Sequence, residues 1–358
     1  MSRLRISTAG ESHGPGEVCL LEGIPAGLGL SSADIDRDLA RRQQGYGRGG
    51  RMAIETDHAC FLAGVRLGRT LGTPIAILVE NRDHANWRAL MSPDSPPADE
   101  TQPDATSVAR PSPVTVPRPG HADLAGLMKY GHDDVRDVLE RASARETVGR
   151  VAGGAVCRRL LSELGVTVAG RVLSIGDVTA PPDGGASFLD PTSVDWEAVE
   201  RSPVACADAA AGKAMCAAVD DARARGESLG GVFEIWCWGL TPGLGGYGTL
   251  DERLDGRLMG ALGSIPAVKG VQVGDAFADA RLPGSEVHDP IYVGRDSLGD
   301  HIERRSNRAG GLEGGMTNGM PLVLRASMKP IPTLTDPLPA VDIQGLYEVK
   351  AHVERSDV

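Results

Sequence analysis

The amino-acid sequence predicts an α+β fold built from two related halves, each combining a sheet with helices. Short apolar runs bounded by Gly or Pro are typical of strands, and they occur at residues 16–24 and 71–80. Residues 231–240 alternate in polarity as a strand does. Apolar residues at helical spacing over 144–164, with Gly165 as the C-terminal cap, predict the clearest helix in the chain.

Caps and turns predict the shorter elements. Ser31 and Ser32 cap a helix that runs through Arg42, and a second helix covers 208–225 and ends at Gly226. Residues 92–119 hold eight prolines among Asp, Ser and Thr. This composition predicts a surface loop rather than a linker between domains, because residues suited to chemistry follow it directly.

Two sequence echoes predict an internal duplication. The segment 23–29 (GIPAGLG) resembles 239–245 (GLTPGLG), and each follows a predicted strand and precedes a predicted helix. The tripeptide at 72–74 (GTP) is echoed at 319–321 (GMP), each opening a strand. We therefore expect two related halves within one α+β domain, with chance similarity between Gly-rich turns as the alternative.

The composition narrows the class of protein. Hydrophobic residues make 41% of the 358 residues and charged residues 24%, which are globular values, and the net charge of -11 disfavours a nucleic-acid partner. The six cysteines show no metal-binding spacing, so reduced thiols in a cytoplasm are the simplest interpretation. No apolar run is long enough for a membrane span, which needs about 18 residues.

The basic residues suggest a small anionic ligand. Of the 37 basic residues 32 are Arg, and they cluster at Arg41, Arg42, Arg48 and Arg51. Arginine binds carboxylate and phosphate oxygens through two parallel hydrogen bonds. A general preference for Arg over Lys would explain the count, so the clustering carries the argument.

A glycine-rich loop lies beside this cluster. Residues 45–50 match the dinucleotide pattern G-x-G-x-x-G, but they follow a predicted helix rather than a strand. A Rossmann site is therefore disfavoured. The loop remains a candidate for close approach of the backbone to an anion.

Two histidines in loops are candidates for proton transfer. His13 precedes a strand, and His121 is flanked by Arg118 and Asp123, which predicts a cluster that binds anions and handles protons. A lone histidine in a loop is more often structural or solvated. Neither histidine has the spacing of a metal site, so no metal is expected.

Further loops carry basic residues between Gly or Pro. Residues 140–147 (ERASARET) precede the long helix and could face an anion, or could form a salt-bridged helix surface. Residues 307–315 and 329–333 could wrap a phosphate and a planar ring. Together these segments describe a ligand with several negative charges and a reaction that needs proton transfer, without a metal or thiol nucleophile.

The order of these segments resembles the chorismate synthase family from residue 6 to residue 357. The matching motifs are GESHG, GYGRGGRM, RPGHAD, ERASARET, PAVKGV, NRAGGLEGGMTNG, KPIPT and RSD. The resemblance implies conversion of 5-enolpyruvylshikimate 3-phosphate to chorismate and phosphate by an anti 1,4-elimination. It implies reduced FMN without net redox change, NADPH as the ultimate reductant, and a separate flavin reductase as one route. It also implies a β-α-β sandwich with a helical core between antiparallel sheets, and a homotetramer.

The resemblance assigns roles to individual residues. It implies that His13 protonates the departing phosphate, that His121 maintains the protonation state of the flavin, and that Asp357 takes a proton from flavin N5. The implied substrate-binding residues are Ser12, Arg42, Arg48, Arg51, Arg118, Ser143 and Arg145. The implied cofactor-binding residues are Arg42, Arg48, Arg141, Ala142, Ser143, Pro266, Ala267, Gly314, Lys329, Pro330, Ile331, Pro332, Thr333 and Arg355.

The chain departs from the family pattern at two places. Ala276 stands where the family usually has Gly, and the sequence stops at Val358, one residue after the RSD motif. We therefore expect a single domain over 1–358 that lacks the family's C-terminal tail, with Arg355 and Asp357 near a terminus that can fray. Two other readings stay open, an NADPH-dependent flavin oxidoreductase and an inactive truncated subunit.

Overall fold

The computed structural model describes residues 4–47, 56–94, 112–181, 188–297 and 299–353. The chain divides into two compact units. The first unit holds the described residues up to Gln44, those from 56 to Leu160, and those from Pro332 onward. The second unit holds 45–47 and Leu161–Ile331. Each unit is described by itself.

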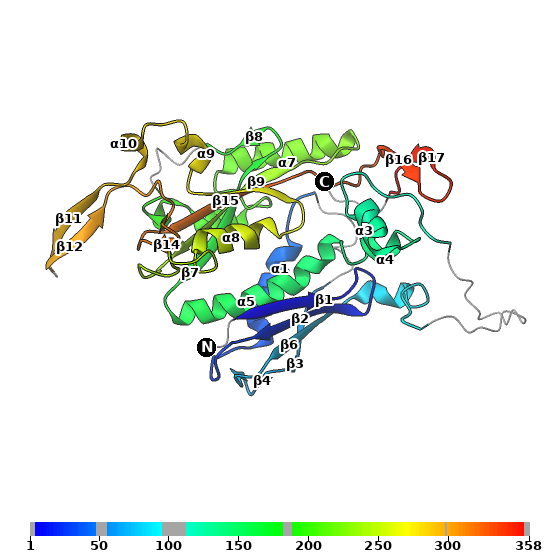
Figure 1. Ribbon diagram of the computed structural model, residues 1–358, viewed down its shortest axis with the longest axis horizontal. Helices are drawn as coiled ribbons and strands as arrows, with labels where there is room; N and C mark the ends of the chain where they lie inside the picture. Colours follow the sequence, from blue (N-terminus) through cyan, green and yellow to red (C-terminus); the bar gives the residue numbers. More distant parts are fainter. Residues whose placement is uncertain (1–3, 48–55, 95–111, 182–187, 298, 354–358) are drawn as a thin grey trace, which may run out of the picture. The chain divides into compact units, whose positions relative to one another are not determined.

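The first unit contains a four-stranded antiparallel sheet with the order β1-β2-β6-β3 (Figure 1). Its strands are β1 (Arg5–Ala9), β2 (Gly16–Glu22), β6 (Ile75–Glu80) and β3 (Ala59–Ala63). The short hairpin of β4 (Val65–Arg66) and β5 (Arg69–Thr70) precedes β6. The strands predicted at 16–24 and 71–80 are confirmed, with slightly shorter bounds.

One face of this sheet forms the core of the first unit. Alternate residues of β2 and β6 are buried, as a sheet with one covered face requires. Two helices complete the core, α1 (Ser32–Gln43) and α5 (Thr147–Glu163). Buried residues of the strands and helices include Cys19, Leu21, Ile75, Ile77, Val79, Ile35, Leu39, Val148, Ala152 and Val156.

The helix predicted over 144–164 is largely confirmed as α5. Residues Ala144–Glu146 instead form the 3-10 turn η2, whose N-cap is Ser143, and the α-helix begins at Thr147. Gly165 has a φ of +74°, the left-handed conformation expected after a helix. Helix α1 is confirmed with Ser31 as its N-cap.

Short elements extend the first unit. They are η1 (Arg82–Asn86), α3 (Asp123–Tyr130), α4 (Arg136–Leu139) and the hairpin of β16 (Pro339–Asp342) and β17 (Tyr347–Lys350). Helices α3 and α4 pack closely, because a Cβ added at Gly126 would lie 2.4 Å from a methyl of Val138. The hydroxyl of Thr115 donates to Asp342, which ties the hairpin to the segment before α3.

The second unit contains a five-stranded antiparallel sheet with the order β10-β15-β9-β7-β8. Its strands are β7 (Thr167–Ile175), β8 (Val178–Thr179), β9 (Gly231–Trp238), β10 (Val268–Val273) and β15 (Leu322–Met328). Its helices are η3 (Pro191–Ser193), α6 (Trp196–Arg201), α7 (Ala209–Ala224), α8 (Leu254–Gly263), α9 (Ala276–Asp279) and α10 (Gly284–Val287). Strand β9 and helix α7 confirm the predictions at 231–240 and 208–225.

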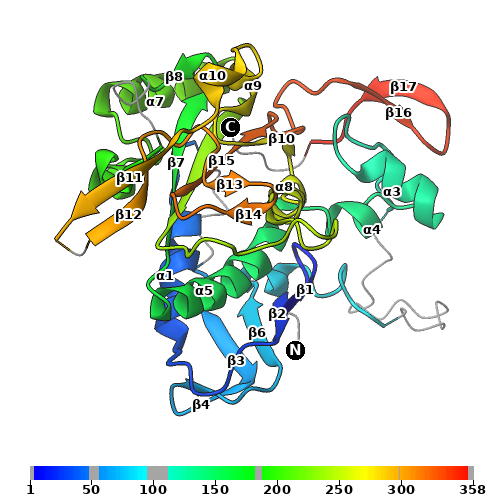
Figure 2. The ribbon, with the colours of Figure 1, turned by 60° about the vertical axis from the view of Figure 1, so that its left-hand side comes forward.

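Two hairpins complete the second unit. They are β11 (Ile291–Asp296) with β12 (Gly299–Arg304), and β13 (Leu312–Glu313) with β14 (Met316–Thr317). Figure 2 shows the β11–β12 hairpin projecting away from the five-stranded sheet of the same unit. Trp236, Phe188 and Val323 are buried together against this sheet.

The two sheets share one order of connections. In the first unit β1, β2, β3 and β6 form a sheet ordered β1-β2-β6-β3, with α1 between β2 and β3 along the chain. In the second unit β7, β9, β10 and β15 have the corresponding order β7-β9-β15-β10, with α8 between β9 and β10 along the chain. Along the chain a short hairpin precedes the last strand of each sheet, β4–β5 before β6 and β13–β14 before β15. Segment 23–29 follows β2 and 239–245 follows β9, so the sequence echoes occupy equivalent positions.

None of the helices in the described ranges combines the length and the apolarity that crossing a membrane requires. All six cysteines lie in the described ranges and are free thiols.

Two glycines of α5 allow the packing of the first unit to be tested. A Cβ at Gly149 would lie 2.9 Å from Cγ2 of Thr8 on β1, whereas a Cβ at Gly154 would meet nothing within 4 Å. We expect Gly154→Ala to raise the free energy of unfolding by about 0.5–1 kcal/mol through helix propensity. Gly149→Ala should lower it, because overpacking typically costs about 1–3 kcal/mol. Urea unfolding checks both, and equal stabilisation by the two variants would contradict the packing of α5 on β1.

Candidate active site

His13 lies in the loop between β1 and β2 and is held on two sides. Its backbone N–H donates to Glu140 Oε2 at 2.7 Å, and its Nδ1 lies 2.8 Å from Glu140 Oε1. Its ring stacks on Trp87 with centroids 3.9 Å apart and planes 21° from parallel. Only 12% of the His13 side chain is exposed. The structure therefore gives this histidine one orientation.

Glu140 connects this loop to the C-terminal end of α4. Its carbonyl oxygen accepts a hydrogen bond from the backbone N–H of Ser12 at 3.0 Å. The hydroxyl of Ser143, three residues later, donates to Ser12 Oγ at 3.1 Å. The predicted site residues Ser12, His13 and Ser143 are thus brought together.

Two of the predicted arginines share one buried carboxylate. Asp57 accepts from Arg145 Nη1 at 2.7 Å and lies 3.4 Å from Arg42 Nη1. Arg145 Nε also donates to Asn81 Oδ1, and the amide of Asn81 donates to the carbonyl oxygens of Glu11 and Gly14. Both guanidinium groups therefore lie at this carboxylate, and guanidinium groups are well suited to binding carboxylate or phosphate oxygens.

The predicted cluster around His121 is also formed. Arg118 Nε donates to Asp123 Oδ2 at 2.9 Å, and His121 Nδ1 bonds to the other oxygen of Asp123. Burial raises the pKa of Asp123, but hydrogen bonds and charges from His121 and Arg118 outweigh it and hold that pKa below its usual range. Arg118 Nη1 also donates to Thr333 Oγ1 at 3.3 Å, so a predicted cofactor residue joins this cluster.

Arg141 binds the backbone of the strand that precedes the His13 loop. It donates to the carbonyl oxygen of Thr8 at 2.9 Å and to that of Gly10 at 3.2 Å. Glu17 Oε2 lies 3.5 Å from Arg141 Nη1. Glu17 is 1% exposed, and its Oε1 has no hydrogen-bond partner among the described residues. Burial raises the pKa of Glu17 to about 7.

Other predicted cofactor residues lie in the second unit. Lys329 follows β15, and its backbone N–H donates to the carbonyl oxygen of Ala267 at 3.0 Å. Ala267 has a φ of +69°, a conformation that residues with a Cβ rarely adopt. The carbonyl oxygen of Ile331 accepts from Ser228 Oγ at 2.7 Å. The structure therefore brings together the predicted segments at 266–267 and 329–331.

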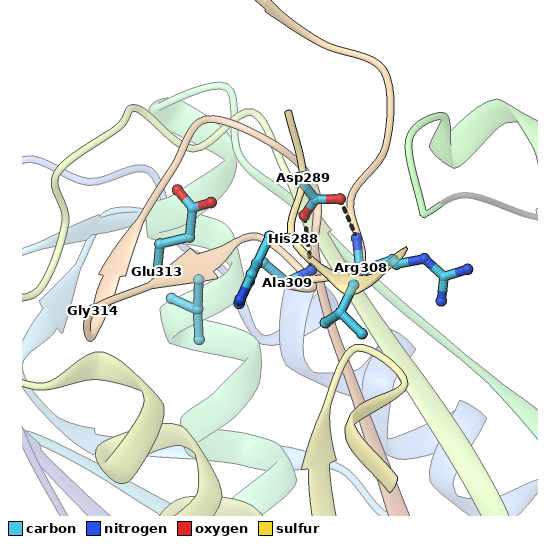
Figure 3. Close-up of a pocket in the computed structure, with 8 residues that line it drawn as sticks. His288, Asp289, Arg308, Ala309, Glu313 and Gly314 are labelled. Atoms are coloured by element: carbon cyan, nitrogen blue, oxygen red, sulfur yellow. Dashed lines mark hydrogen bonds between the residues drawn. The ribbon is translucent and has the colours of Figure 1, made fainter. Parts of the chain in front are cut away.

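A cavity of about 460 Å³ lies at Gly314 in the same unit (Figure 3). Gly314 occupies the turn between β13 and β14, and nothing lies within 4 Å of where its Cβ would be. Asp289 accepts from the backbone N–H groups of Arg308 and Ala309, which orders one wall. Figure 3 shows the Arg308 side chain directed away from His288. The volume is within the range of small-molecule sites.

The remaining predicted residues are placed as follows. Ala142 lies between Arg141 and Ser143, where its N–H donates to the carbonyl oxygen of Val138, and Pro266, Pro330 and Pro332 flank residues already described. Arg48, Arg51, Arg355 and Asp357 lie outside the described residues.

The sequence did not predict three of the close contacts of His13. Glu140 was part of the motif at 140–147, but nothing local indicated that it faces a residue 127 positions earlier. Trp87 and His84 carried no signal at all, although His84 Nδ1 lies 3.0 Å from the carbonyl oxygen of His13. Within this motif Glu140 and Arg145 are buried rather than on an exposed helix surface.

Histidines paired with buried carboxylates beside clustered arginines are typical of one class, an acid–base enzyme for an anionic ligand. The chain belongs to the chorismate synthase family, because the family model described as chorismate synthase matches residues 4–358. The family is one of carbon–oxygen lyases.

Relatives and a solved structure agree with this membership. The chain is 54% identical over 355 residues to the chorismate synthase of Symbiobacterium thermophilum, covering 99% of this chain and 88% of the relative. It is 51% identical to chorismate synthase 1 of Bacillus cereus, covering 99% and 87%. A crystal structure of chorismate synthase matches with a TM-score of 0.75 and 40% identity, covering 93% of this chain and 85% of the other. The resemblance predicted from eight motifs is confirmed.

The raised pKa of Glu17 predicts a pH-dependent stability. Its ordinary pKa is 4.5, so between about pH 4.5 and 7 the folded state binds more protons than the unfolded state. The free energy of unfolding should therefore fall as pH rises through this window, by at most about 3 kcal/mol. Glu17→Gln removes this loss. Urea unfolding of both proteins from pH 4.5 to 8 should show the stability of the variant rising relative to that of the wild type. A constant difference between them would contradict the raised pKa of this buried carboxyl.

Proposed function

We propose that this chain converts 5-enolpyruvylshikimate 3-phosphate to chorismate and phosphate by an anti 1,4-elimination without net redox change. Family membership over residues 4–358 supports the reaction class. The observation that carries the proposal is the pairing of each loop histidine with a buried carboxylate, with arginines beside them. Such pairs can orient an acid or base for a defined proton transfer.

Arginine side chains would bind the substrate, which has two carboxylates and a phosphate. Arg42, Arg118 and Arg145 supply guanidinium groups that neighbouring carboxylates hold in place. Ser12 and Ser143 add hydroxyl groups beside His13. Arg48 and Arg51 are proposed for the same role.

His13 would act as the acid toward the departing phosphate. A proton delivered to the phosphate as the C–O bond breaks makes the phosphate a better leaving group. A positioned acid of this kind typically contributes on the order of 10²- to 10⁴-fold in rate. His121, held by Asp123, would keep the flavin region in the required protonation state. Asp357 is retained as the third acid–base residue.

Two observations support the proposed binding of a planar cofactor with a phosphate. Gly314 leaves open space in a cavity of about 460 Å³. Lys329 is joined to Ala267 by a backbone hydrogen bond, and Ile331 follows Lys329 by two residues. The other residues that we propose for cofactor binding are Arg141, Ala142, Ser143, Thr333, Pro266, Pro330, Pro332, Arg48 and Arg355. When bound, reduced FMN would supply the electron that promotes C–O cleavage without net redox change, with NADPH as the proposed ultimate reductant.

We also propose that the two halves arose by internal duplication. The shared strand order and the equivalent positions of both sequence echoes support this origin. The placement of helices between the two sheets and the single-domain organisation stay predictions.

Assembly and location follow the family pattern in this proposal. We propose a homotetramer that works in the cytoplasm, and the free thiols agree with a reducing compartment.

Replacing each proposed acid–base histidine tests the function. We expect His13→Ala and His121→Ala to lower turnover at least about tenfold while the fold survives, because each removes a positioned proton donor. The assay mixes protein with chemically reduced FMN and 5-enolpyruvylshikimate 3-phosphate without oxygen, and follows chorismate absorbance and phosphate. His301→Ala, on the exposed hairpin, is the matched control. Near-normal turnover in either site variant would remove that histidine from the mechanism.

Cofactor stoichiometry separates the lyase from an NADPH-dependent flavin oxidoreductase. A redox-neutral elimination should release many equivalents of chorismate for each equivalent of reduced FMN supplied. Steady oxidation of one NADPH per product, measured at 340 nm, would favour the oxidoreductase instead.

A further inference from the structure

We propose that Glu140 is the positioning residue of His13, selecting which ring nitrogen carries the proton that reaches the substrate. This inference rests on the proposed role of His13. It assigns no contact with the substrate to Glu140, whose effect passes through the imidazole.

Among the described residues, both carboxylate oxygens of Glu140 form hydrogen bonds with His13. One oxygen accepts from the backbone N–H at 2.7 Å, and the other lies 2.8 Å from Nδ1. A carboxylate can only accept, so the neutral imidazole carries its hydrogen on Nδ1. Any proton that His13 gives to a substrate is then on Nε2, the other ring nitrogen.

The two bonds also fix the loop and the ring together. The backbone bond holds the loop residue, and the Nδ1 bond sets the rotation of the ring within its plane. Trp87 stacks on one face and sets the tilt of that plane. Because the ring is held at Nδ1 by Glu140 and on one face by Trp87, it has little freedom to rotate, and Nε2 keeps one direction.

The surroundings make this bond strong and its loss costly. The Glu140 side chain is 4% exposed, and water competes little with the His13 contact. Glu140 closes α4, where its N–H donates to the carbonyl oxygen of Arg136, so its backbone is held independently of His13. The carboxylate is therefore in place before any ligand binds.

Asp123 forms a similar pair with His121 but is a poorer test. It also accepts from the side chain and backbone of Arg118, so removing it would release a proposed substrate-binding residue as well. Glu140 has no such second side-chain partner among the described residues. Its variants isolate the positioning effect.

Nitrogen NMR of labelled histidine tests the tautomer directly. The signal of His13 is assigned by its loss in His13→Ala. We expect wild-type His13 to be the Nδ1–H tautomer, and Glu140→Ala to give a mixture of both tautomers. Glu140→Gln keeps one acceptor oxygen for the backbone N–H of His13, so its amide NH2 faces Nδ1 and should shift the population toward the Nε2–H tautomer. An unchanged tautomer in Glu140→Ala would overturn the proposal.

Kinetics test whether the effect passes through His13. Glu140→Ala should lower kcat at least about tenfold, as loss of an orienting partner does, with KM changed less than about threefold. In the His13→Ala background Glu140→Ala should cause no further fall. An equal fall in both backgrounds would show that Glu140 acts elsewhere.

Glu234 provides a matched control for the loss of a buried carboxylate. It is 0% exposed on β9 and bonds Arg171 and Arg325 in the second unit. Glu234→Gln should lower the Tm but leave the His13 tautomer and the kcat of folded enzyme unchanged. If His13→Ala retains turnover, the proposed role of His13 fails, while the tautomer spectra still decide whether Glu140 positions the ring.

Discussion

A carboxylate removed from water must receive hydrogen bonds or an opposite charge, and this requirement positions the loops of the first unit. Glu140 holds the His13 loop, Asp57 holds Arg42 and Arg145, and Asp123 holds Arg118 and His121. Apolar packing builds the sheet and helices beneath them. The geometry of the candidate site therefore depends on charge pairs, whose distances and directions are stricter than those of apolar contacts.

The same requirement applies in the second unit, whereas Glu17 in the first unit does not fully meet it. Glu234 on β9 forms ion pairs with Arg171 on β7 and Arg325 on β15, so this buried carboxylate in the middle of the sheet is paired on both sides. Glu17 is equally buried, yet one of its oxygens has no partner among the described residues, and its pKa is raised to about 7. Such exceptions concentrate at functional sites, and Glu17 lies beside Arg141, a proposed flavin contact.

Local signals account for the part of the fold that the sequence predicted. Strands β2 and β6 alternate in burial with a period of two, and α5 and α7 are each followed by a glycine in the left-handed conformation. The start of α5 was placed three residues early because Ser143 caps a 3-10 turn before the α-helix. The β11–β12 hairpin gave no comparable signal, since five of the six residues of β11 are exposed and no burial pattern marks it.

Sequence distance decided which parts of the site were predictable. Arg118, His121 and Asp123 lie within six positions, so their residue types alone predicted a cluster, and the contacts confirm it. Glu140 bonds Nδ1 of His13 as Asp123 bonds Nδ1 of His121, but Glu140 and His13 are 127 positions apart in the sequence. Both histidines meet a carboxylate at Nδ1 despite this difference in separation. The recurring feature is therefore the geometry at the imidazole, which the chain achieves once through a local turn and once through its tertiary fold.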